Sequence, residues 1–451
     1  MEPESTIDDI IKSVQRFRIL SIGRSGVGKS SLVNCVFGIT GARVSHLKPG
    51  ESDIEQEFIS QDNPFFVLHD SKGFEPGDIT NFEIVREFIE QRSKQGLPLK
   101  DRIHGLWLCT KTPAAGGRVF EIGDEKLLEF AHKIQIPVVI VFTQYDRLVR
   151  TKKAELKDEH PNMDPATLDE RGKDEARKAF EICVQSLQHT MNRLKIPMPD
   201  YVKVSVRPGY KEDVSALVEV TRDIVKERLK GDAWIMWAIA QRASLPVKIE
   251  ACITILDYRR VLTGTMPGFG QILLRSCLME VHNDIIKCWN FRGEVLNTEE
   301  FKQLMLHLVQ DVHTKPDVST SPNIDKISQF VSLVTAASAP IAPPVAILGL
   351  TYIFLQWLST TALDNIPEVQ RLLVAYIVDL VNVLRELFDF TLKPTLALTT
   401  TWEELREAFE AYERSSSRQR IHNIICSKVP QGEQTLTANG LDENVRALVD
   451  G

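Results

Sequence analysis

Apolar residues in the first half of the chain fall into short runs separated by amphipathic stretches. These runs have the length and composition of buried strands: residues 17–22, 65–69, 103–110, 137–143 and 201–206. Apolar residues at helical spacing lie between them, at residues 29–37, 81–95, 122–133, 165–194 and 214–229. Strands that alternate with helices predict a mostly parallel sheet with helices on both faces. We therefore expect an α/β domain at 17–230, preceded by an N-terminal helix within 1–16.

The second half of the chain has a different pattern. After Gly231 the alternation ends, and long segments with apolar residues at helical spacing follow. This pattern predicts a mainly α-helical domain at 231–414 and a polar C-terminal tail at 415–451. Within the first domain, the polar stretch 150–164 is expected to be an exposed insert.

One stretch of the helical half, residues 327–363, contains no Asp, Glu, Lys, Arg or His. It is long enough for a membrane element, because about 20 apolar residues span a bilayer. Its prolines would break a single span into a hairpin. The alternative is a buried helical hairpin, which its serine, threonine and glutamine side chains favour. Both interpretations stay open at this point.

Charge and cysteine content narrow the function classes. The net charge of −7 argues against a nucleic-acid binder that works through a basic surface. The seven cysteines form no CxxC pair, which suits free thiols in a reducing compartment, and Cys35 and Cys109 lie in apolar runs where we expect burial. The polar, acidic start of the chain is neither a signal nor a transit peptide. We expect a cytoplasmic protein, with membrane association left open by 327–363.

The strongest motif follows the first predicted strand. Residues 23–30, Gly-Arg-Ser-Gly-Val-Gly-Lys-Ser, match the P-loop pattern GxxxxGK[ST] between a strand and a helix. Its glycines let successive backbone N–H groups point at phosphates, and the helix N-terminus adds partial positive charge. Lys29 would reach the terminal phosphates, and the Ser30 hydroxyl would ligate Mg²⁺. The predicted phosphate-binding residues are Ser25, Gly26, Val27, Gly28, Lys29, Ser30 and Ser31. Arg24 is expected to be either solvated or a stabiliser of developing charge.

A second motif, Asp-Ser-Lys-Gly at 70–73, follows another strand. Asp70 would hold a Mg²⁺-bound water, and the Gly73 N–H would sense the γ-phosphate. Lys29 and Gly73 are therefore the expected catalytic groups. The polar loop 46–57 should supply a further Mg²⁺ ligand, for which Ser52 is the first choice and Ser45 the second.

A third motif distinguishes GTP from ATP. Strand 137–143 ends in Thr143-Gln144-Tyr145-Asp146, where GTPases have [NT]KxD. The Asp146 carboxylate would accept from the ring N–H and the exocyclic amine of guanine, and adenine has no such donor pair. Gln144 departs from the usual Lys, whose aliphatic stem packs on the base. Backbone N–H groups at Ser205 and Val206 are candidates for contact with the guanine carbonyl.

With these motifs in order, residues 17–230 resemble the translation-factor-like and Era-like GTPases. The segments 68–77 and 103–109 resemble fungal G-domain proteins of uncharacterised function. The resemblance implies a P-loop NTPase G domain that binds GTP or GDP with Mg²⁺. Ras-like proteins place a water-orienting Gln after the DxxG glycine, whereas this chain has Phe74. Phe cannot hydrogen-bond water, so the resemblance implies slow hydrolysis.

The predicted function is a GTP-binding switch that acts on the helical domain, with GTP hydrolysis to GDP and phosphate. Expected partners are the guanine nucleotide and a protein effector or a second copy, through the G domain or the helical domain, without nucleic acid. A nucleotide-bound scaffold or membrane-associated protein with little turnover is one alternative. A P-loop ATPase is another, which Asp146 disfavours.

Overall fold

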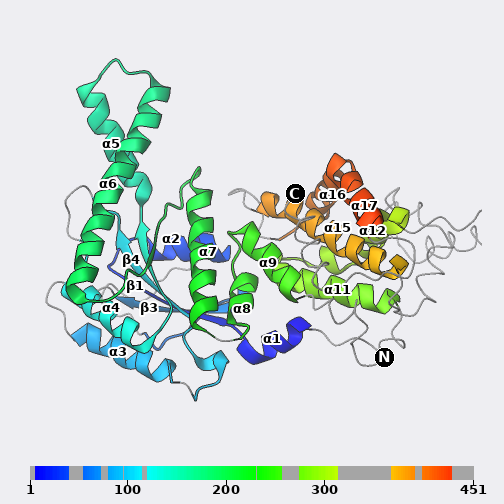
Figure 1. The fold of residues 1–451 in the computed structure, drawn as a ribbon, viewed down its shortest axis with the longest axis horizontal. Helices are drawn as coiled ribbons and strands as arrows, with labels where there is room; N and C mark the ends of the chain where they lie inside the picture. The colour runs from blue at the N-terminus through cyan, green and yellow to red at the C-terminus, as the bar shows by residue number, and fades with distance from the viewer. Residues whose placement is uncertain are drawn as a thin grey trace, which may run out of the picture. The chain divides into compact units, whose positions relative to one another are not determined.

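The computed structural model describes residues 6–39, 54–72, 80–94, 96–113, 119–229, 231–255, 274–312, 367–391 and 399–428. The chain forms two compact units (Figure 1). The first is Ile10–Val247, and the second combines Met1–Asp9 with Lys248–Gly451. Two helices span the points where the chain passes between the units: α1 Thr6–Val14 and α9 Leu245–Ile255.

The first unit is built on a six-stranded sheet in the order β2-β3-β1-β4-β5-β6. All neighbouring strands are parallel except β2, which is antiparallel to β3. The central strand is β1, where Leu20 lies opposite both His69 and Leu106. The strands are β1 Phe17–Gly23, β2 Phe58–Ser60, β3 Asn63–Lys72, β4 Gly105–Lys111, β5 Val138–Thr143 and β6 Asp200–Lys203. The predicted α/β fold with a mostly parallel sheet is confirmed.

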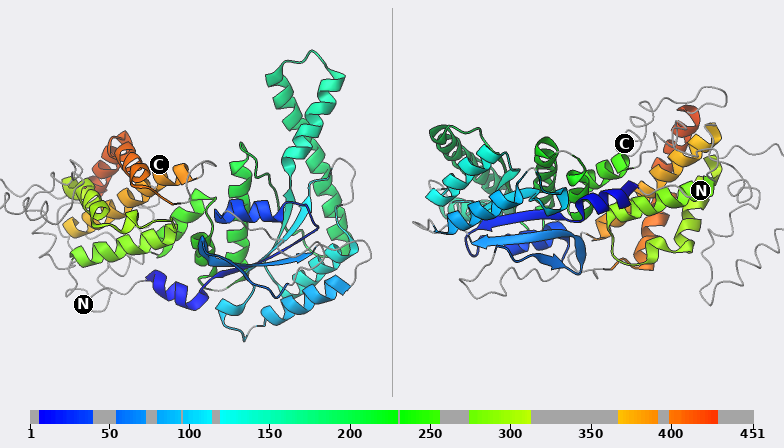
Figure 2. Two further views of the ribbon diagram at one scale, coloured as in Figure 1. Left: turned by 180° about the vertical axis from the view of Figure 1, so that it is seen from behind. Right: turned by 90° about the horizontal axis from the view of Figure 1, so that it is seen from below.

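Helices cover both faces of this sheet (Figure 2). On one face, alternate strand residues such as Leu20, Leu108 and Phe142 pack with Phe88 of α3, Leu127 of α4 and Phe180 of α6. The helices of the unit are α2 Lys29–Phe37, α3 Thr80–Arg92, α4 Ile122–Ile134, α5 Tyr145–Glu159, α6 Pro165–Leu194, α7 Lys211–Arg228 and α8 Ala233–Ala240, with a 3-10 turn η1 at Leu99–Asp101.

An aromatic cluster closes the other face. The rings of Phe37 and Phe66 stack at 3.8 Å between centroids, and Trp237 of α8 packs against Phe37 and Trp107. The Trp107 indole donates to Thr221 Oγ1 of α7 at 3.1 Å. Because Trp237 completes this core, α8 belongs to the first unit, and that unit ends later in the chain than the boundary expected after residue 230.

Helices α5 and α6 lie side by side and project from the sheet (Figure 1). The stretch 150–164, expected to be an exposed insert, is exposed at most of its positions, and it is helical as far as Glu159, where α5 ends. The buried positions of α5 include Leu148, Val149 and Leu156. Their helical spacing is hard to recognise in the sequence because charged residues surround them. Asp164 caps α6 by accepting from the backbone N–H groups of its first turn.

The second unit is helical, and α15 is its central element, in contact with α11, α12, α16 and α17. Asp379 of α15 is fully buried; it accepts from the Tyr412 hydroxyl at 2.7 Å and lies 2.9 Å from His422 Nε2. His422 belongs to α17, so the expected polar tail begins with a packed helix. The elements are α11 Leu274–Trp289, η3 Val295–Asn297, α12 Glu299–Val309, η4 Gln310–Val312, α15 Pro367–Thr391, α16 Trp402–Glu413 and α17 Ser416–Lys428.

The described helices include none that is both long and apolar enough to cross a bilayer. The segment 327–363 lies outside the described residues, so its two interpretations stay predictions. Of the two cysteines expected to be buried, Cys109 is buried but Cys35 is exposed. The prediction for Cys35 was wrong because α2 turns Leu32, Val33 and Val36 inward and leaves Cys35 on its outer side.

Candidate nucleotide-binding site

The P-loop connects the end of β1 to the start of α2. Gly26 and Gly28 have φ angles of 75° and 103°, in the left-handed region that favours glycine. Gly23 needs to be glycine for a different reason, since a Cβ there would lie 2.4 Å from the Cys109 carbonyl oxygen of β4. Three glycines of the motif, Gly23, Gly26 and Gly28, therefore allow the backbone conformation of the loop.

Lys29 lies over this loop. Its ammonium donates to the Gly23 carbonyl at 2.5 Å and lies 3.7 Å from Asp70 Oδ1. Ser30 and Ser31 follow in the first turn of α2, where free N–H groups and the helix dipole favour an anion. The structure therefore places a cation and a helix N-terminus at the same loop.

Asp70 reaches this loop from β3. Its Oδ1 is buried without a hydrogen-bond partner. Burial raises the pKa of the Asp70 carboxyl to about 6, and the neighbouring Lys29 ammonium opposes this increase. A carboxylate oxygen without a hydrogen-bond partner, together with the serine hydroxyls in the first turn of α2, suits Mg²⁺. This ion binds through one or two protein oxygens plus phosphates and water. Within the described residues no cluster of three or more His, Cys, Asp or Glu side chains could hold a metal by itself.

Thr143, at the end of β5, joins the two ends of the site. Its Oγ1 donates to the Val27 carbonyl of the P-loop at 2.6 Å and lies 3.1 Å from the Thr110 carbonyl. Its own carbonyl accepts from the Thr112 hydroxyl at 2.8 Å. The strand that carries the base-side residues is therefore attached to the phosphate loop.

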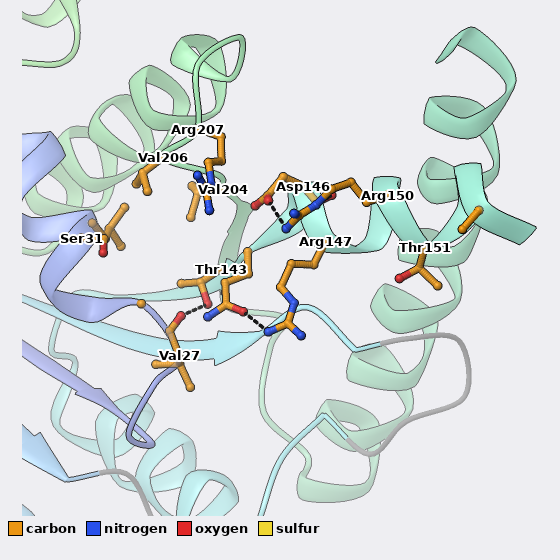
Figure 3. A pocket seen from close by; sticks show the side chains of 14 residues that line it. Val27, Ser31, Thr143, Asp146, Arg147, Arg150, Thr151, Val204, Val206 and Arg207 are labelled. Carbon is orange, nitrogen blue, oxygen red and sulfur yellow. Dashed lines mark hydrogen bonds and ion pairs between the residues drawn. The ribbon is translucent and has the colours of Figure 1, made fainter. Parts of the chain in front are cut away.

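Asp146 lies in the first turn of α5 and is 9% exposed. Its Oδ1 accepts from the Ser205 hydroxyl at 2.9 Å. Its Oδ2 accepts from Arg150 at 2.9 Å (Figure 3). Ser205 also accepts from the Arg207 backbone N–H at 3.2 Å. Ser205 thus positions Asp146 through its side chain, whereas the sequence suggested only a backbone contact with guanine.

An open cavity of about 770 Å³ lies between these elements (Figure 3). This volume falls within the usual range for small-molecule sites. Of the predicted site residues, the cavity is lined by Val27, Gly28, Ser31, Thr143, Gln144, Asp146 and Val206. Ser25, Gly26, Lys29, Ser30, Asp70 and Ser205 are described but are not part of its lining. Ser52 and Gly73 lie outside the described residues, as do Ser45 and Phe74.

Sequence reasoning missed three arginines that line the cavity, Arg147, Arg150 and Arg207. Arg150 could have been predicted as a partner of Asp146, because it lies four residues later on the same helix, where side chains are neighbours. Arg24, the P-loop arginine, forms an ion pair with Glu121 at 2.6 Å. Glu121 is the N-cap residue of α4, so Arg24 is directed towards that helix.

Comparisons with known proteins agree with this geometry. Residues 18–144 match the family model described as "50S ribosome-binding GTPase". Residues 295–451 match another family model, described as "Domain of unknown function (DUF8505)". The two matches cover separate parts of the chain.

Several of the similar proteins are GTP-binding proteins or GTPases. A probable GTP-binding protein EngB of Porphyromonas gingivalis is 29% identical over 127 residues, which are 28% of this chain and 59% of that protein. The chain therefore spans less than two thirds of this relative. A GTPase Der of Deinococcus deserti is 31% identical over 155 residues, 32% of each chain. A crystal structure of a probable GTP-binding protein engB covers 47% of this chain, with 16% identity and a TM-score of 0.29. The matched family model, the EngB and Der relatives, and the P-loop between β1 and α2 of a mostly parallel sheet identify the first unit as a P-loop GTPase domain.

Proposed function

We propose that this protein binds GTP and GDP, with Mg²⁺, between the P-loop and Asp146, and that it hydrolyses GTP slowly. The observation that carries the proposal is the 2.6 Å hydrogen bond from Thr143 to Val27. This bond joins the phosphate loop to the strand that presents Asp146. A nucleotide with its phosphates at Lys29 would then direct its base towards Asp146.

Each end of the site has a distinct chemical role. At the phosphate end, the Lys29 ammonium neutralises the terminal phosphates, while the Ser30 hydroxyl and Asp70 would hold Mg²⁺. When bound, Mg²⁺ neutralises charge that develops on the β- and γ-phosphate oxygens. At the base end, Asp146 accepts from the two donors of guanine, and Ser205 holds the carboxylate in place.

Asp146 Oδ2 accepts from Arg150 and has a second lone pair, so guanine can donate to the same oxygen while Arg150 stays in place. The Arg150 side chain is 63% exposed. The Asp146 side chain is only 12% exposed, so this ion pair is partly buried, and Arg150 neutralises the carboxylate at the edge of the cavity.

Slow turnover is proposed because Phe74 takes the place of the water-orienting Gln. The expected intrinsic rate is near the unassisted Ras rate of about 10⁻⁴–10⁻³ per second. Single-turnover hydrolysis, measured over a range of protein concentrations, tests this. A fast rate in dilute protein would contradict it, and a rate that rises with concentration would indicate that a second copy supplies a catalytic group.

The output of the switch is proposed to be the helical unit. GTP and Mg²⁺ would order the segments around Ser52 and Gly73, and hydrolysis would release them. A nucleotide-bound scaffold with little turnover is the second candidate, and Phe74 is the observation that favours it.

Base selection is tested with Asp146→Asn. The variant should bind GDP at least about tenfold more weakly, since a charge-assisted hydrogen bond contributes roughly 1.5–3 kcal/mol. It should gain affinity for xanthosine diphosphate, whose ring presents the complementary acceptor. Asp158→Asn, on an exposed position of the same helix, is the matched control. An unchanged preference for GDP in the Asp146 variant would contradict guanine recognition by Asp146.

A further inference from the structure

The base-side motif has Gln144 where GTPases usually have Lys. Gln144 is the N-cap residue of α5 and adopts φ 57° and ψ 34°. This left-handed conformation is uncommon for a residue with a side chain. The backbone therefore holds Gln144 in a specific orientation at the edge of the cavity.

The Gln144 side chain is committed to the P-loop. Its Nε2 donates to the Gly26 carbonyl at 2.8 Å. A Cβ built on Gly28 would lie 3.8 Å from that nitrogen, so the amide lies across the loop backbone. The usual Lys packs its aliphatic stem on the base and carries a positive charge. Gln144 is shorter and uncharged, so it provides less surface for the base and no positive charge.

Arg147 is hydrogen-bonded to Gln144 and can add to the surface that faces the base. Its guanidinium donates to Gln144 Oε1 at 3.0 Å, and its own backbone N–H bonds to the Gln144 carbonyl at 2.9 Å. Arg147 lines the same cavity as Asp146, one residue further along the first turn of α5 (Figure 3). Two contacts thus attach Arg147 to Gln144, on the side of the cavity where Asp146 receives the base.

Arg150, the other arginine of α5 that lines the cavity, is less suited to contact the base. Arg150 donates to Asp146 Oδ2, so its charge is used to neutralise the carboxylate. The Arg147 guanidinium bonds only to an uncharged amide in the described structure. A guanidinium is planar, always charged, and stacks on aromatic rings, including those of bases.

We infer that Arg147 is a positioning residue for guanine, which together with Gln144 replaces the Lys of the usual motif. Gln144 fixes the guanidinium through its amide oxygen, and the guanidinium supplies the flat surface and the positive charge beneath the base. This inference rests on the proposed function of the same site.

A double-mutant cycle on the full-length protein tests the inference. Fluorescent GDP is titrated into the wild type, Arg147→Ala, Gln144→Lys and the double variant. Arg147→Ala should weaken GDP binding about three- to tenfold, the effect expected of one cation–π contact or one charged hydrogen bond. In the Gln144→Lys background the same change should have less than about a twofold effect, because the Lys stem then packs on the base and supplies the charge. Lys157→Ala, at an exposed position of α5, should leave the affinity unchanged.

The outcomes are distinguishable. An equal loss of affinity from Arg147→Ala in both backgrounds would overturn the coupling between Arg147 and Gln144, and no loss in either would overturn a role for Arg147. Arg147 is exposed, so folding should be retained, which circular dichroism checks. A wild type that binds no GDP would instead overturn the proposed function itself.

Discussion

Thr143→Val removes the hydroxyl that links the base side of the site to the P-loop while nearly keeping the side-chain volume. The residue is 3% exposed, so water cannot replace the 2.6 Å bond to the Val27 carbonyl or the 3.1 Å contact with the Thr110 carbonyl. Leaving a buried carbonyl without its donor costs about 1–3 kcal/mol. A domain of this size melts about 2–4 °C lower for each kcal/mol, so we expect a melting temperature lower by about 2–12 °C.

The same change should weaken GDP binding, because the P-loop loses an anchor at Val27. Thermal melting of the full-length variant, with and without GDP and Mg²⁺, measures both effects. Thr254→Val is the matched control, since Thr254 is exposed on α9, lies outside the lining of the cavity, and donates its hydroxyl to the Glu250 carbonyl of the same helix. If Thr143→Val melts like the wild type and binds GDP equally well, the link between the two ends of the site has no energetic role.

Three further predictions concern other parts of the chain. Lys29→Ala should abolish Mg²⁺-GTP binding in a calorimetric titration, and binding as tight as that of the wild type would refute the phosphate-site assignment. Burial lowers the pKa of His282 to about 4, so the helical unit should lose up to about 3 kcal/mol as the pH falls from about 6.5 towards 4. His282→Gln should reduce this pH dependence of the urea midpoint, and an unchanged dependence would exclude His282 as its source. If the segment 327–363 is buried, the full-length protein should stay in the supernatant after mixing with liposomes, whereas salt-resistant flotation would favour the membrane alternative.

Local sequence was sufficient to predict many of the helices and the P-loop of the first unit. The structure places α2 at Lys29–Phe37 and α6 at Pro165–Leu194, the ranges predicted from the helical spacing of their apolar residues. Both helices have clear end signals, a glycine-rich turn before α2 and the Asp164 cap with a following proline before α6. The P-loop likewise needs only residues that are adjacent in the chain.

Features that depend on distant residues could not be predicted in the same way. Strand β2 contains only Phe58–Ser60, and its antiparallel pairing with β3 has no local signal. The role of α8 depends on Trp237 meeting Phe37 and Trp107, which are far away in sequence. On the base side, the motif identified Asp146, but its hydrogen bond with Ser205, 59 residues away in sequence, became evident only when the fold brought the two side chains together.

The most direct test of guanine-nucleotide binding at this site is a side-by-side titration of the full-length protein with GDP and ADP in the presence of Mg²⁺. Asp146 offers two acceptor oxygens that only guanine can use, so GDP should bind at least about 100-fold more tightly than ADP. Equal affinity for the two nucleotides, or tighter binding of ADP, would contradict the assignment of this site to guanine nucleotides.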